Sequence, residues 1–96
     1  MRGLPFGDYG RAINHYQLAA DRNPENIYAW LRLLSVFHAA GRITKAQDLI
    51  QSLDGVVMDE RHVEEMEHLV SEYRTPTFEK EGSKFRMTLA RSGPGL

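Results

Sequence analysis

The sequence predicts an all-α fold in which antiparallel helical hairpins stack into a short superhelix. Apolar residues recur three and four positions apart in four successive segments, which is the spacing that lets a helix bury one face. Proline or glycine separates these segments and ends each helix. The chain also matches itself at an offset of 34 residues, as helical-repeat proteins do. Because helices of about 11 to 15 residues are not stable alone, these four are expected to pack in antiparallel pairs.

The composition is that of one small domain without thiol or disulfide chemistry. Of the 96 residues, 42% are hydrophobic and 26% are charged, the formal net charge is -1, and cysteine is absent. This near-neutral charge argues against a dedicated nucleic-acid binder, which usually has a basic face. The most apolar stretch, residues 29–40, is interrupted by Arg32 and His38 and is shorter than the roughly 20 residues that cross a bilayer. The first residues lack the apolar core of a signal peptide, so we expect a cytoplasmic protein with no membrane partner.

The first helix is expected over residues 8–22. Asp8 can cap its first turn, and Asn23-Pro24 ends it because proline cannot continue a helix. Its apolar face comprises Tyr9, Ala12, Ile13, Tyr16, Ala19 and Ala20. These side chains form one stripe, which a neighbouring helix has to cover.

The second helix is expected over residues 27–40. Asn26 can cap its first turn, and Gly41 follows its end, where glycine readily adopts the left-handed backbone that terminates helices. Its inward face comprises Ala29, Trp30, Leu33, Leu34, Phe37 and Ala40. We expect Trp30 and Phe37 to fill the wider gaps between helices that alanines elsewhere bring close together.

The third and fourth helices are expected over residues 43–53 and 59–73. The inward positions of the third are Ile43, Ala46, Leu49, Ile50 and Leu53, and Asp54-Gly55 ends it. Those of the fourth are Val63, Met66, Leu69, Val70 and Tyr73, and Thr75-Pro76 ends it. All four helices together predict one helical domain over residues 7–74.

Residues 75–96 depart from the helical pattern. Phe85, Met87 and Leu89 alternate with polar residues, which is the period of a strand, and residues 81–83 can form the turn of a hairpin. An isolated two-stranded hairpin is only marginally stable in water. We therefore expect a C-terminal tail, extended or in a β-hairpin, that is disordered or becomes ordered only against a partner.

The internal match at 34 residues identifies the repeated unit. It pairs Gly7 with Gly41, Tyr9 with Ile43, Ala12 with Ala46, Tyr16 with Ile50 and Ala19 with Leu53. Together with Pro24 and Trp30, this pattern over residues 7–54 resembles the tetratricopeptide repeat, as one complete repeat preceded by half a repeat. The structural positions of the family fall on Gly7, Tyr9, Ala12, Tyr16, Ala19, Pro24, Trp30, Leu33, Phe37, Gly41, Ala46, Ile50 and Leu53. Residues 59–73 resemble the helix that closes such arrays.

The resemblance implies a scaffold that binds proteins and has no catalytic residue, cofactor or metal. In this family the inner helix of each repeat lines a concave groove for a peptide or a partner helix. The groove positions fall on Tyr28, Leu31, Arg32, Ser35, His38 and Ala39. Arg32 can hold a carboxylate with two hydrogen bonds.

Half of the first repeat is missing, which leaves one flank of helix 8–22 without a local partner. Either the chain is a fragment of a longer repeat protein, or this flank docks on another chain. We favour the fragment and expect self-association, through this flank or through the C-terminal tail, as its consequence.

Other functions have weaker support in the sequence. Residues 39–53 also resemble the pentatricopeptide repeat, which binds RNA, but the period of 34 and the absence of a basic surface oppose that alternative. Glu65 and His68 have the spacing of one di-iron ligand pair, yet no second pair exists. No serine lies in a nucleophile elbow. The apolar residues of the tail could occupy the groove of the same or a neighbouring molecule as an extended ligand, which is the form that several peptide-binding modules recognise.

Overall fold

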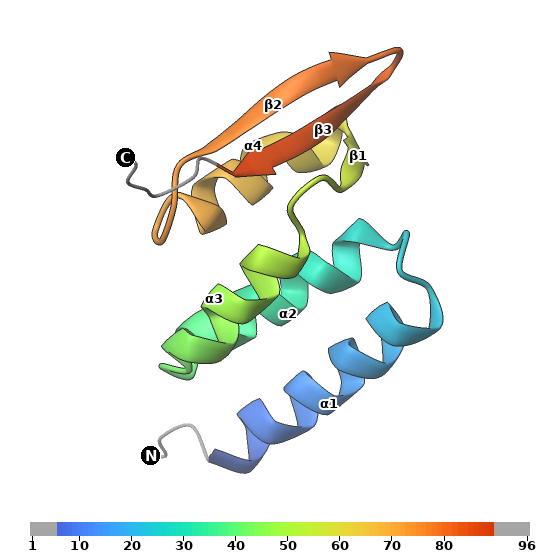
Figure 1. Ribbon diagram of the computed structural model, residues 1–96. Coiled ribbons are helices and arrows are strands. Elements are labelled where there is room, and N and C mark those ends of the chain that lie inside the picture. Colours follow the sequence, from blue (N-terminus) through green and yellow to red (C-terminus); the bar gives the residue numbers. More distant parts are fainter. Residues whose placement is uncertain (1–5, 90–96) are drawn as a thin grey trace. The chain divides into compact units, whose positions relative to one another are not determined.

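The computed structural model describes residues 6–89, with side chains from Tyr9 onward, and this range contains four helices and three strands (Figure 1). The elements in chain order are α1 (Phe6–Arg22), α2 (Ile27–Ala39), α3 (Ile43–Ser52), β1 (Val57–Asp59), α4 (Glu60–Val70), β2 (Pro76–Glu81) and β3 (Lys84–Leu89). The chain forms two compact units. The first unit reaches to Ala46 and the second begins at Gln47, so the boundary lies inside α3.

The first unit is built on a helical hairpin, in which α1 packs against α2 (Figure 1). A tight turn of residues 23–26 joins the two helices. The Asn26 side chain accepts a hydrogen bond from the backbone N–H of Ala29 at 3.4 Å, which caps α2 as its sequence predicts. The Trp30 indole N–H donates to the carbonyl oxygen of Pro24 at 2.8 Å. This bond links the α1–α2 connection to the first helical turn of α2, so the position of α2 relative to that connection is fixed by a local contact.

Most of the buried apolar surface of this unit belongs to α2. Its buried side chains are Ile27, Ala29, Leu31, Leu33, Leu34 and Phe37. In α1, by contrast, only Ala20 is buried among the described side chains, and the tyrosines at 9 and 16 are half-buried. Because α2 contributes most of the core, its few exposed positions lie on a narrow strip.

Gly41 ends α2 and leads the chain into α3. Its φ of +74° is the left-handed conformation that glycine adopts without a steric penalty. The N–H of Gly41 donates to the carbonyl of His38 at 3.1 Å, and the N–H of Arg42 donates to that of Phe37 at 2.9 Å. Both bonds satisfy carbonyl groups that the end of α2 would otherwise leave free.

The second unit contains a three-stranded antiparallel sheet with the strand order β1-β3-β2. The β2–β3 pair is a hairpin with a two-residue turn, in which Gly82 has a φ of +65°. In β1, Met58 pairs with Phe85 of β3. Helix α4 packs on this sheet and contacts all three strands.

The predicted helices are present, but a three-stranded sheet accompanies them, so the fold is not purely all-α. One of the two forms expected for the C-terminal tail, a β-hairpin, is present as β2 and β3. The alternation of residues 85–89 was a strand signal, but β3 pairs with β1 as well as with β2, and β1 has only three residues and lies far away in the sequence. Asp59 belongs to β1 and a turn begins at Ser71, so α4 is shorter at both ends than the expected helix 59–73. Residues 76–89 of the expected tail form strands within the chain, and residues 90–96 lie outside the described range.

One face of the sheet carries the apolar residues that α4 covers. Buried side chains of the second unit include Met58, Met66, Val70, Met87 and Leu89. Residues at alternate positions, such as Glu79, Arg86 and Thr88, belong to the other face. This division gives the hairpin a core to fold on, because a two-stranded hairpin alone buries too little surface.

Candidate functional site

The exposed strip of α2, which we call the α2 surface, consists of Tyr28, Arg32, Ser35, His38 and Ala39. Tyr28, Arg32, Ser35 and Ala39 follow one another at intervals of four, three and four residues, which places them on one side of the helix. Tyr28 is 56% exposed, His38 and Ala39 are also exposed, and Arg32 and Ser35 are half-buried. Five of the six predicted groove residues thus reach the surface on one helix.

Tyr28 and Arg32 contact each other on the α2 surface. The Arg32 guanidinium carbon lies 5.4 Å from the centre of the Tyr28 ring, within the range of a cation–π interaction. This contact restrains two long side chains in one arrangement, so less conformational entropy is lost when a partner binds them. The arrangement presents an aromatic ring, a phenolic hydroxyl and a positive charge together.

Leu31 does not belong to the α2 surface, because its side chain is only 1% exposed. It follows Ile27 by four residues and precedes Leu34 by three, and all three side chains are buried. A second buried series, Ala29, Leu33 and Phe37, lies beside the first. The prediction assumed one buried face for this helix, whereas α2 has two. The spacing of Ile27, Leu31 and Leu34 was the signal that sequence reasoning missed.

The predicted structural positions of the repeat have different degrees of burial. Leu33, Phe37, Ala46, Ile50 and Leu53 are buried, whereas Tyr9, Ala12, Tyr16, Ala19 and Trp30 are half-buried. Pro24 is exposed in the α1–α2 turn, Gly41 has the positive φ described above, and Gly7 lies within α1. The buried positions belong mainly to α2 and α3, and the half-buried ones mainly to α1.

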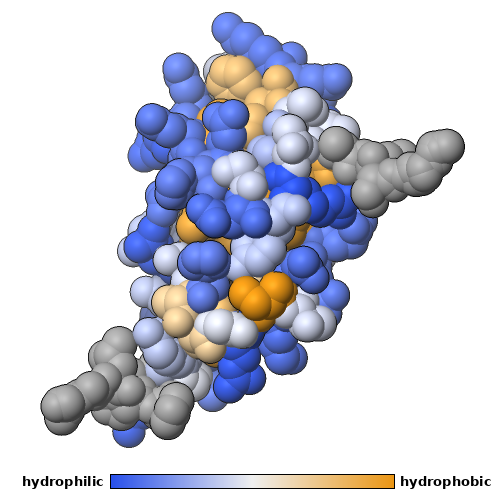
Figure 2. Space-filling model, turned by 90° about the vertical axis from the view of Figure 1, so that its left-hand side faces the viewer, coloured by the Kyte–Doolittle hydropathy of each residue, from blue (hydrophilic) through white to orange (hydrophobic). Residues whose placement is uncertain are grey.

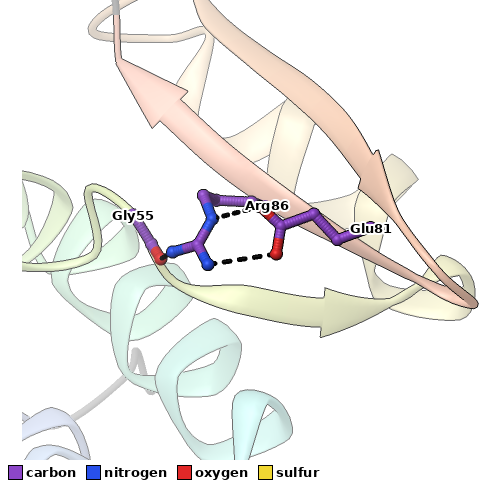
Figure 3. A network of polar contacts seen from close by, with 3 residues as sticks. All are labelled: Gly55, Glu81 and Arg86. Atoms are coloured by element: carbon purple, nitrogen blue, oxygen red, sulfur yellow. Dashed lines mark hydrogen bonds and ion pairs between the residues drawn. The ribbon is translucent and has the colours of Figure 1, made fainter.

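The second unit contains a polar network that joins its hairpin to the loop after α3 (Figure 3). Arg86 donates to both carboxylate oxygens of Glu81, at 2.6 and 3.0 Å, and to the carbonyl oxygen of Gly55 at 2.8 Å. The hydrogen bond and charge of Arg86 lower the pKa of Glu81, and Glu81 in turn raises the pKa of Arg86. The Leu89 N–H donates to the Asp54 carboxylate at 3.0 Å in the same loop. These contacts tie the hairpin to the loop after α3.

The remaining surface gives no sign of a metal centre in the part of the chain that the structure describes. Within residues 6–89, no three His, Cys, Asp or Glu side chains are grouped so that they could hold a metal ion. Figure 2 shows one side of the molecule, where hydrophilic side chains predominate and hydrophobic ones form small separate patches. Among the side chains that the structure describes, the large hydrophobic ones that are exposed are Leu18, Tyr28 and Ile43, and all of them belong to the first unit. No helix in the described range is long and apolar enough to cross a membrane.

Comparison with protein families finds a match to a model described as tetratricopeptide repeat, over residues 6–65. The matched range holds α1, α2, α3, β1 and the first half of α4. Comparison with curated proteins gives no match, and neither does comparison with solved structures. Since the family model covers more than half of the chain and agrees with the helical hairpin and its repeat positions, this chain belongs to the tetratricopeptide-repeat family.

Proposed function

We propose that the chain is a protein-interaction module that binds a peptide or a partner helix on the α2 surface. Tetratricopeptide repeats are in general modules for protein–protein interaction, and the family match supports that role here. The proposal requires no chemical step. Binding consists of covering apolar and hydrogen-bonding groups on a helix that is already folded.

The observation that carries the proposal is the exposed Tyr28 ring with the Arg32 guanidinium over it. Tyrosine and arginine are enriched among the residues that contribute most to binding energy at protein interfaces. An exposed aromatic ring gains by burial against a partner, and its hydroxyl keeps a hydrogen bond there. Ser35 and Ala39 continue the same strip and leave room for a chain to lie along it.

The test compares the proteins captured from a lysate by the wild-type chain and by the Tyr28→Ala/Arg32→Glu variant. We expect partners to be lost from the variant, because it removes the ring and reverses the charge at the amino-terminal end of the α2 surface. Leu18→Ala is the matched control, since Leu18 is also exposed, at 54%, but lies on α1. Circular dichroism checks that both variants keep their helices. If the wild type and the double variant captured identical sets of partners, the α2 surface would not be the binding site.

RNA binding, the alternative raised by the pentatricopeptide-like residues, is separated from this proposal by a salt titration with single-stranded RNA. A complex with RNA weakens steeply as salt rises, because binding releases the counterions of the phosphates. We expect no salt-sensitive RNA complex of the wild-type chain. Tight binding that falls with salt and is lost in the double variant would assign the α2 surface to RNA instead.

A further inference from the structure

Charge is distributed unevenly between the two units. Up to Ala46 the chain has six Lys and Arg against three Asp and Glu, whereas from Gln47 onward it has six against ten. No acidic residue occurs between Asn26 and Gln47. The near-zero net charge therefore results from two oppositely charged parts, and proteins with a net charge near zero associate more readily than highly charged ones.

The positive part includes an exposed segment at the amino end of α3, which we call the cationic corner: Arg42, Ile43 and Lys45. All three side chains are exposed, Ile43 at 44%. The backbone of the corner is fixed, because the Arg42 N–H bonds to Phe37 and the Arg42 carbonyl accepts from the Ala46 N–H at 3.0 Å. Arg42 and Lys45 have no side-chain hydrogen bond or ion pair among the described residues.

Arg42 and Lys45 lie at the amino end of α3, where positive charges destabilise a helix. Arg42 precedes α3 and Lys45 lies in its first turn, which contains no acidic residue. The amino end of a helix carries a partial positive charge, so cations there are repelled and anions are attracted. Negative charge from outside would remove this repulsion. An apolar group beside the anions would also cover Ile43.

A surface of opposite charge to the cationic corner lies on α4. We call it the acidic stripe: Glu60, Glu64 and Glu67. Spaced by four and three residues, these side chains are exposed on one side of the helix, with the half-buried Val63 between them. Like charges at this spacing repel one another. No hydrogen bond or ion pair engages the three carboxylates within the described range. A cationic partner would relieve this repulsion as well.

We propose that the cationic corner of one copy of this chain binds the acidic stripe of a second copy. Ile43 packs against Val63 at the centre of the contact, and Arg42 and Lys45 pair with the three glutamates around it. The arrangement has the apolar centre and polar rim of ordinary protein interfaces. This inference is independent of the proposed function of the α2 surface, because none of the five residues of that surface takes part.

The two contact surfaces differ, so the association is head-to-tail. A complex of two copies still offers one free corner, on one copy, and one free stripe, on the other, so such a contact forms open chains unless its rotation closes a ring. Exposed ion pairs contribute little each and are screened by salt, with a Debye length of about 10 Å at 0.1 M and about 3 Å at 1 M. We therefore expect a weak association that depends on both protein concentration and salt.

The test is sedimentation of the full chain over a hundredfold range of concentration, at low salt and at 1 M salt. The weight-average mass should rise above that of the monomer at low salt and return to it at 1 M. Arg42→Glu/Lys45→Glu and Glu64→Lys/Glu67→Lys should each remain monomeric where the wild type associates. An equimolar mixture of the two variants should associate again, because the unaltered corner of the stripe variant meets the unaltered stripe of the corner variant, and the two reversed surfaces are also of opposite charge.

Two further variants make the test specific. Arg11→Glu/Arg22→Glu produces the same change of net charge as the corner variant, at exposed positions of α1, and should associate like the wild type. Ile43→Ser should weaken association severalfold without changing any charge. A monomeric wild type at every concentration would overturn the proposal. So would an association that survives either charge reversal, or a mixture of the two reversed variants that stays monomeric.

Discussion

Replacing Met87 by alanine should unfold the second unit selectively. Met87 is fully buried on the apolar face of β3, and its backbone N–H and C=O bond to Val56 and Gly55 in the loop after α3. The substitution leaves those backbone bonds possible but creates a cavity, and Met→Ala changes in a core cost about 2–5 kcal/mol. Small domains are stable by only about 5–15 kcal/mol in total, so this loss is a large fraction of the free energy of unfolding.

Urea unfolding and native-state hydrogen exchange measure the effect. With a urea m-value of about 1–2 kcal/mol/M, the midpoint should fall by at least about 1 M. Exchange should quicken in α4, β2 and β3 more than in α1 and α2, because the cavity lies in the second unit. The matched control is Thr88→Ala, an exposed neighbour whose loss should cost no more than about 0.5 kcal/mol. A loss below about 1 kcal/mol for Met87→Ala, or equal acceleration in α1, would refute the reasoning.

Three other substitutions test separate parts of the structure. Leu31→Asp should unfold the chain at 25 °C because it buries a charge, whereas Tyr28→Asp should leave the circular dichroism spectrum unchanged; equal effects would contradict the division of α2 into core and surface. Gly82→Val should lower the thermal midpoint, since the left-handed backbone at φ +65° costs a side chain roughly 1–2 kcal/mol; an unchanged midpoint would argue against this turn. The Lys84 hydrogen bond and charge lower the pKa of Asp59 below 3.8, so its stabilisation is complete above that pH and is lost as the pH falls through the folded value. Asp59→Asn should therefore flatten the fall in unfolding free energy that the wild type shows below about pH 4, and an unaltered acid profile would exclude this ion pair as a contributor.

The helices could be predicted because their signals are local. A cap at Asn26, a left-handed glycine at Gly41 and apolar residues at intervals of three and four each act within one or two turns. The sheet could not be predicted in the same way. Its central strand, β3, pairs with β1 across an intervening helix and strand, and a three-residue strand has no distinctive pattern of its own. Alternation in residues 85–89 indicated a strand but not its partner.

The candidate site could likewise be predicted only where its signals lie within α2 itself. Periodicity placed Tyr28, Arg32 and Ala39 on one side of α2, and the structure has them on its exposed strip or at the edge of it. It could not show that Leu31 is buried, because the number of buried faces of a helix depends on neighbours that its own sequence does not specify. The cation–π contact of Tyr28 and Arg32 depends on rotamers, which the spacing of four residues permits but does not dictate.

At α4, the packing seen in the second unit differs from the helix-on-helix packing that the family pattern predicts. The tetratricopeptide match continues to residue 65, inside α4, yet α4 packs on a three-stranded sheet. Backbone bonds from Gly55 and Val56 to Met87, with the Asp54 carboxylate on Leu89, tie the loop after α3 to β3. Sequence similarity thus covers α1 to α3 and reaches past this loop into α4, whereas long-range strand pairing decides what α4 packs against. Functional inference from the family accordingly applies to α2, and inference about the sheet and α4 has to rest on their own residues.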